Sequence, residues 1–109
     1  MPGAAWLVLI AAAVLEVTGD AVIRKGLRGG GLALIALGFC LLGCYGLVVN
    51  RVSWDFSRLL GVYVVIFALV SVLYGRFFFG ERVAASTWVG LAVLGVGAGI
   101  LHFGPYFHW

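Results

Sequence analysis

The stretch AAWLVLIAAAVLEVTGDAVI, residues 4–23, decides how the rest of the chain is interpreted. It has the length and composition of a helix that crosses a lipid bilayer, yet Glu16 lies close to its middle. An ionisable side chain at that depth costs about 2.5–3.5 kcal/mol on insertion scales. Such an acid is retained where it is paired, packed against another helix or used, and the remaining segments indicate which of these applies.

Composition places the chain among integral membrane proteins. Of its 109 residues, 64% are hydrophobic and only 10% are charged, which is too little polar surface to cover a soluble domain of this size. The seven Lys and Arg residues lie near the ends of the apolar segments, as topology signals do. A nucleic-acid surface needs a basic stripe on a soluble face, so the lipid bilayer is an expected partner and nucleic acid is not.

Four apolar segments are each long enough to cross the bilayer as a helix. The predicted spans cover residues 4–23, 32–49, 59–79 and 85–103. These runs are continuous and lack the alternation that is typical of a transmembrane β-barrel. The prediction is therefore an all-α fold, an integral membrane four-helix bundle in which residues 1–109 form a single membrane domain.

The distribution of basic residues favours one orientation in the membrane. The first and third loops carry five of them, namely Arg24, Lys25, Arg28, Arg76 and Arg82. The second loop carries two, Arg51 and Arg58. This difference favours cytoplasmic first and third loops, with both termini outside the inner (cell) membrane. Five against two is a modest bias, so insertion in both orientations stays open.

Small residues surround Glu16 on its helical face. Ala12, Ala13 and Gly19 lie three or four positions away, and they are expected to leave a recess for another helix, water or a ligand. Because intramembrane acids are functional by default, we expect Glu16 to carry a proton or a substrate. The alternative is a structural acid that is hydrogen-bonded to a neighbouring helix.

Two further residues are candidates for the same site. Asp20 lies one turn beyond Glu16 and one turn before Arg24, so it either forms an ion pair at the helix end or belongs to the ion path. In the third segment, Tyr63 begins an aromatic stripe that can face a cation, with ordinary helix packing as the alternative. We therefore predict Glu16, Tyr63 and Asp20 as proton- and substrate-binding residues.

The fourth segment is rich in glycine. Gly90 and Gly97 are seven residues apart and face the same way, while Gly95 and Gly99 form a GxxxG pattern. Small residues at these spacings let helices pack backbone to backbone. We predict that these four glycines form an oligomer contact; packing within the chain is the alternative.

Enzyme chemistry, metals and bound cofactors are not expected. The chain has no Ser/His/Asp arrangement, no phosphate-binding loop and no metal-ligand spacing. Cys40 and Cys44 are four residues apart in an apolar run, without a neighbouring His or acid. We interpret them as packing residues, neither metal ligands nor a disulfide pair.

Together these features resemble the small multidrug resistance transporters of the drug/metabolite transporter superfamily. The resemblance rests on four short spans, on LEVTGD around Glu16, on FFGER at residues 78–82 and on Gly90 with Gly97. It implies an antiparallel homodimer in which two first-span glutamates line one chamber, where protons and a cationic substrate compete. It further implies that Glu16 is the shared binding site, that Tyr63 is an aromatic of that site, and that Gly90 and Gly97 belong to the dimer seam.

The resulting prediction is a proton-coupled exporter of a small cationic molecule that works as a homodimer. Two alternatives stay open. In one, the chain is a non-transporting subunit beside a larger partner, which supplies basic residues to Glu16 and Asp20. In the other, it is a flippase-like relative with a non-cationic substrate. Asp20 is a second acid that the resemblance does not supply.

Overall fold

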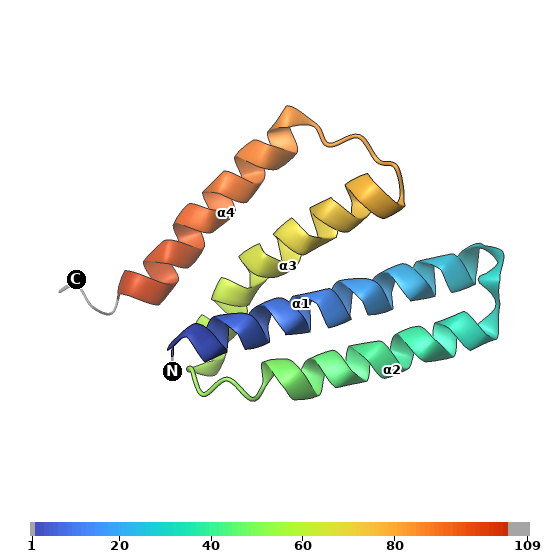
Figure 1. Cartoon of the computed structure of the whole chain (residues 1–109). Helices are drawn as coiled ribbons and strands as arrows, with labels where there is room; N and C mark the ends of the chain where they lie inside the picture. The colour runs from blue at the N-terminus through green and yellow to red at the C-terminus, as the bar shows by residue number, and fades with distance from the viewer. Residues whose placement is uncertain (1, 105–109) are drawn as a thin grey trace. The chain divides into compact units, whose positions relative to one another are not determined.

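The computed structural model describes residues 2–104 of the protein. In chain order it contains α1 (Pro2–Lys25), a wide turn η1 (Gly26–Gly30), α2 (Leu32–Val49), α3 (Phe56–Phe78) and α4 (Ala85–Phe103), as Figure 1 shows. No strand occurs between residues 2 and 104. The predicted all-α fold class, with four helices long and apolar enough to cross a membrane, is confirmed.

The helix bounds differ from the predicted spans mainly in the first and third segments. The helices α2 and α4 begin and end at the predicted residues, whereas α1 is two residues longer at each end. The third helix begins three residues earlier than predicted, because the Leu59 amide already donates to the Asp55 carbonyl oxygen over 2.8 Å. With 23 residues, α3 is about 34 Å long, slightly more than the hydrocarbon thickness of a bilayer.

The chain divides into two compact units, Met1–Ser53 and Trp54–Trp109. The first unit holds α1, η1 and α2, and the second holds α3 and α4. In each unit two helices run in opposite directions and are joined by a short connection (Figure 1).

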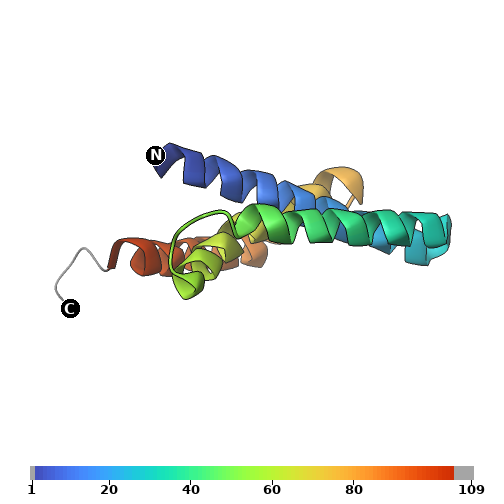
Figure 2. The ribbon, with the colours of Figure 1, turned by 90° about the horizontal axis from the view of Figure 1, so that it is seen from below.

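In the first unit, α1 and α2 approach each other backbone to backbone. A Cβ atom added to Gly19 would lie 3.0 Å from Leu42 Cγ and 3.1 Å from the Gly38 carbonyl oxygen. A Cβ atom added to Gly38 would lie 2.8 Å from the Gly19 carbonyl oxygen and would also collide with the Ile23 side chain. Close approach through small residues is a common way for membrane helices to pack. Figures 1 and 2 show the two helices side by side.

Glycine also shapes the turn between these helices. The Gly31 amide donates to the Gly26 carbonyl oxygen over 3.1 Å, which closes a turn wider than an α-helical one. Gly29 and Gly31 have φ angles of 112° and 93°, a region that residues with a side chain disfavour. Gly26 is buried beside Ile35 at the start of α2. The glycine loop predicted here is therefore a compact reversal.

In the second unit, one end of the α3–α4 pair is held by aromatic and cationic side chains. Leu101 of α4 lies over Gly61 of α3. Next to it, the His102 ring centroid lies 4.8 Å from that of Trp54, and the Arg58 guanidinium lies 5.2 Å from the same indole ring. Contacts of this kind add specific attraction to apolar packing.

The connection between α3 and α4 folds back onto the last turns of α3. Gly80 has a φ angle of 66°, and the Glu81 amide donates to the Gly75 carbonyl oxygen over 2.9 Å. The Glu81 carboxylate lies against Gly75, where any side chain would collide with it. The FFGER segment therefore ends α3 by a glycine-mediated reversal, a common device at helix C-termini.

Candidate functional site

Glu16 lies near the middle of α1 and is half-buried. Ala12 and Ala13, in the preceding turn, are fully buried. The recess expected beside Gly19 is not open, because side-chain and backbone atoms of α2 fill that space. Gly19 therefore allows α1 to pack closely on α2. Glu16 lies one turn away from this close contact between the two helices.

The residue of α2 that faces Glu16 is Tyr45. Contacts across the α1–α2 pair follow one register, given by the pairs Gly19–Leu42, Ile23–Gly38 and Gly26–Ile35. Three residues farther from the turn on each helix, the same register pairs Glu16 with Tyr45. The charge of Glu16 acts on the Tyr45 phenol, which agrees with this placement.

A carboxylate beside a phenol has chemistry that neither group has alone. The phenol hydroxyl donates a hydrogen bond to a charged carboxylate and accepts one from a protonated acid, so it suits both protonation states. Its aromatic face also attracts cations. Sequence reasoning did not select Tyr45, although one signal was present: folding the sequence symmetrically between Gly30 and Gly31 pairs residues 16 and 45.

The other two predicted binding residues have different surroundings. Asp20 is exposed on α1, one turn closer to η1 than Glu16. Tyr63 belongs to α3 in the second unit, where it is buried and its ring centroid lies 6.3 Å from that of Phe67. This contact within one helix is the packing named above as the alternative for the aromatic stripe. The binding roles of Asp20 and Tyr63 stay predictions.

The four glycines predicted as an oligomer contact lie on an open surface of α4. A Cβ atom added to Gly90, Gly95, Gly97 or Gly99 would meet no atom within 4 Å. No residue of α4 is buried, although the whole helix lies within the described range. Gly90 and Gly97 face one side of α4, whereas Gly95 and Gly99 face roughly the opposite side. Within the second unit both sides are open to another helix, and the oligomer contact stays a prediction.

The two cysteines are exposed on α2 and carry free thiols. Within residues 2–104, no group of three or more His, Cys, Asp and Glu side chains is arranged to hold a metal ion. The candidate site of the first unit therefore consists of a carboxylate, a phenol and the apolar side chains around them.

Four spanning helices with a carboxylic acid inside the first define the chain as a small multi-pass membrane protein. The chain is 36% identical over 104 residues to a UPF0060 membrane protein of Mycobacterium marinum, which covers 94% of each sequence. It is 32% identical over 101 residues to a UPF0060 membrane protein of Mycolicibacterium vanbaalenii, which covers 91% of this chain and 94% of the relative. The chain belongs to the UPF0060 membrane protein family. Neither a family model nor a solved structure matches it.

Proposed function

We propose that the protein is a proton-coupled exporter of the small multidrug resistance type, which exchanges protons for a small cationic molecule at Glu16. The observation that carries this proposal is the carboxylate of Glu16 facing the phenol of Tyr45 between two helices long enough to span the membrane. An acid inside a membrane span marks an ion or substrate path by default. The sequence resemblance of LEVTGD, FFGER and the spaced glycines supports the same function.

Exchange at this pair follows from mutual exclusion. When Glu16 is ionised, its charge and the aromatic face of Tyr45 attract a cation. When a proton binds to Glu16, the charge is lost and the cation is released. Export against a gradient then requires that proton and cation each change the equilibrium between inward-open and outward-open states. Asp20, exposed one turn from Glu16, is suited to pass protons between the carboxylate and water.

The proposed transporter is a homodimer in the inner membrane. Four short helices are too few to enclose a chamber comfortably, and the open glycine surface of α4 offers a seam for a second copy. The resemblance implies an antiparallel pair, in which Tyr63 contributes an aromatic wall. The modest excess of basic residues in the first and third loops favours termini outside the cell and leaves room for insertion in both orientations.

Proton release from the purified full-length protein tests the proposal. A panel of guanidinium-like and quaternary ammonium cations is added to the wild type, Glu16→Gln and Glu16→Asp in weakly buffered detergent solution. We expect cation-dependent proton release from the wild type, none from Glu16→Gln, and release over a shifted pH range from Glu16→Asp. Glu81→Gln removes an acid outside the proposed site and is the control, and its proton release persists if Glu16 is the shared site. Equal release from Glu16→Gln and the wild type contradicts the proposal.

The open surface of α4 also fits a second function, a non-transporting subunit that docks on a larger membrane protein. In that case Glu16 and Asp20 pair with basic residues of the partner. Gentle purification distinguishes the two: a homodimer alone supports the exporter, and a stoichiometric second protein supports the subunit. Proton release with neutral or anionic compounds, and not with cations, supports a flippase-like relative instead.

A further inference from the structure

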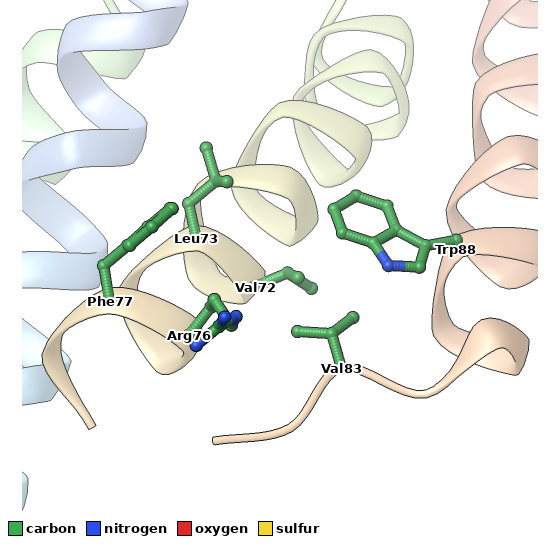
Figure 3. A pocket seen from close by; sticks show the side chains of 6 residues that line it. All are labelled: Val72, Leu73, Arg76, Phe77, Val83 and Trp88. Atoms are coloured by element: carbon green, nitrogen blue, oxygen red, sulfur yellow. The ribbon is translucent and has the colours of Figure 1, made fainter. Parts of the chain in front are cut away.

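A cavity of about 260 Å³ lies within the second unit, at the end where α3 meets its connection to α4. Six residues line it: Val72, Leu73, Arg76, Phe77, Val83 and Trp88. Figure 3 shows Val72, Val83 and Trp88 gathered around one space, with Arg76 at its edge. This volume is below the range of roughly 300–1,000 Å³ for sites that enclose a drug-sized molecule. The cavity therefore suits one end of a larger molecule.

The lining combines apolar walls with a single positive charge. Arg76 is exposed and its guanidinium lies 5.9 Å from the Phe77 ring, and no acidic residue is part of the lining. The nearest acid along the connection, Glu81, turns its carboxylate onto Gly75, which does not line the cavity. The guanidinium therefore keeps its charge available for an anion, and arginine is well suited to bind phosphate oxygens through two hydrogen bonds.

The position of the cavity along the helices matches the headgroup level of a bilayer. It involves the last two turns of α3 and the first turn of α4, so it lies at the end of two spanning helices. Trp88, about half exposed, is of the type that concentrates at the membrane–water interface. A phosphate group at this depth comes with a glycerol and acyl chains, for which Val83 and Trp88 supply apolar contacts. Free phosphate would leave those walls without a partner.

We propose that this cavity binds the phosphate end of an anionic phospholipid, with the phosphate on the Arg76 guanidinium and the first acyl carbons against Val83 and Trp88. The lining of this cavity does not include Glu16, and the proposal is independent of the transport proposal. It makes the end of the second unit sensitive to the lipid composition of the leaflet that it contacts, because anionic lipids attract nearby Arg and Lys residues.

Quenching of Trp88 fluorescence by brominated lipids tests the proposal. In the full-length chain, Trp6, Trp54 and Trp109 are changed to Phe, and the protein is reconstituted in phosphatidylcholine vesicles. Equal small fractions of brominated phosphatidylglycerol or brominated phosphatidylcholine are then compared. We expect phosphatidylglycerol to bind about fivefold more tightly, the factor that one basic residue near the surface provides.

Two arginine variants show whether the preference comes from this cavity. Arg76→Gln is expected to abolish the preference for phosphatidylglycerol. Arg82→Gln removes a charge from the same connection without touching the lining, and it is expected to retain the preference. Equal quenching by both lipids, an equal loss in the two variants, or displacement of the lipid by inorganic phosphate would overturn the proposal. No quenching by either lipid would show that protein covers the cavity, which also overturns it.

A second measurement keeps the proposal testable if the triple Trp variant does not fold. Native mass spectrometry is applied to the wild type, Arg76→Gln and Arg82→Gln with all four tryptophans retained. It counts the lipids that each protein retains after exchange into detergent micelles that contain both phosphatidylglycerol and phosphatidylcholine. Retention of phosphatidylglycerol by the wild type and by Arg82→Gln, with its loss in Arg76→Gln, supports the site. Retention that is equal in all three proteins contradicts it.

Discussion

In the α1–α2 unit, glycine lies where two helices touch, whereas the glycines of α4 have open space around them within the second unit. Gly19 and Gly38 bring two backbones together, and neither position has room for a side chain. Gly90 and Gly97 have open space where a side chain would be. Glycine thus allows two helices to pack together in the first unit, and in the second unit it leaves a surface on which another helix can pack. Glycine spacing alone does not distinguish these cases; the register of the neighbouring helix does.

Gly38→Val, which tests the glycine contact between α1 and α2, is expected to change stability the most. The new side chain collides with Ile23 and with the Gly19 backbone, and overpacking of this kind destabilises by about 1–3 kcal/mol. A destabilisation near the upper end of this range is expected, because the Gly19 carbonyl oxygen belongs to the backbone and cannot rotate away as a side chain can. Unfolding of the purified protein in mixed detergent measures the change. Gly43→Val is the matched control, since Gly43 of the same helix has open space around it. Equal stability of the two variants would contradict the close approach.

Tyr45→Phe tests the site that the tight crossing positions. The ring and its packing remain, but the hydroxyl beside Glu16 is lost. A hydrogen bond to a charged group contributes on the order of 1.5 kcal/mol, so cation binding and cation-dependent proton release should weaken about tenfold. Tyr74→Phe makes the same change in the second unit and should leave binding unaltered. Weakening by the control as large as that by Tyr45→Phe would show that the effect is not local.

An effect of similar size, on stability instead of binding, is expected where glycine serves the backbone in the second unit. Gly80→Ala places a side chain at a φ angle of 66°, which costs about 1–2 kcal/mol for a residue other than glycine. The same change at Gly90, in open helical surface, should have the opposite sign or none. Thermal unfolding of both variants checks this. Destabilisation by Gly90→Ala comparable to that by Gly80→Ala would mean that the α4 surface is occupied in the native assembly.

The smallest effect on protomer stability is expected from Gly97→Val. Because the position is open, the free energy of unfolding should change by no more than about 0.5 kcal/mol. The predicted homodimer should nevertheless weaken, because a branched side chain keeps two backbones apart. Cross-linking in lipid measures the dimer, with Val89→Leu as the control, because Val89 is exposed on α4 away from the face of Gly90 and Gly97. If the dimer of Gly97→Val is as stable as that of the wild type, the dimer contact does not involve this surface.

Hydropathy and loop composition were sufficient to predict the four helices, because each apolar run has a length that only a spanning helix suits. The start of α2 followed from the glycine loop at residues 29–31, and the start of α4 followed from the charged residues Glu81 and Arg82 before it. Glu16 could be selected from its cost in the membrane alone. Its neighbour Tyr45 was not predicted, because residue spacing along one helix does not show which residue of the next helix lies opposite until the chain is folded about Gly30 and Gly31.

Features that depend on local folding of the connections were beyond sequence reasoning. Nothing in the letters FFGER indicates that Glu81 turns back onto Gly75, since this depends on the φ angle of Gly80. The cavity beside Arg76 exists because of that reversal, and it was equally hidden. At Gly19 the sequence predicted a feature that the structure does not have. The small residues indicated an open recess, but atoms of α2 fill that space.

The symmetry of the first unit about its glycine turn has a consequence for synthesis. The chain emerges from the ribosome N-terminus first, so α1 reaches the membrane with Glu16 before its neighbour on α2 exists. Once α2 has followed, Tyr45 comes to lie beside the acid without any contribution from the second half of the chain. The two segments are therefore best inserted together as a helical hairpin, with the acid accompanied by its phenol. Inserting one residue into α2 between Leu42 and Tyr45 would rotate Tyr45 by about 100° away from the face that Gly38 and Leu42 present to α1, and Glu16 would lose its phenol neighbour.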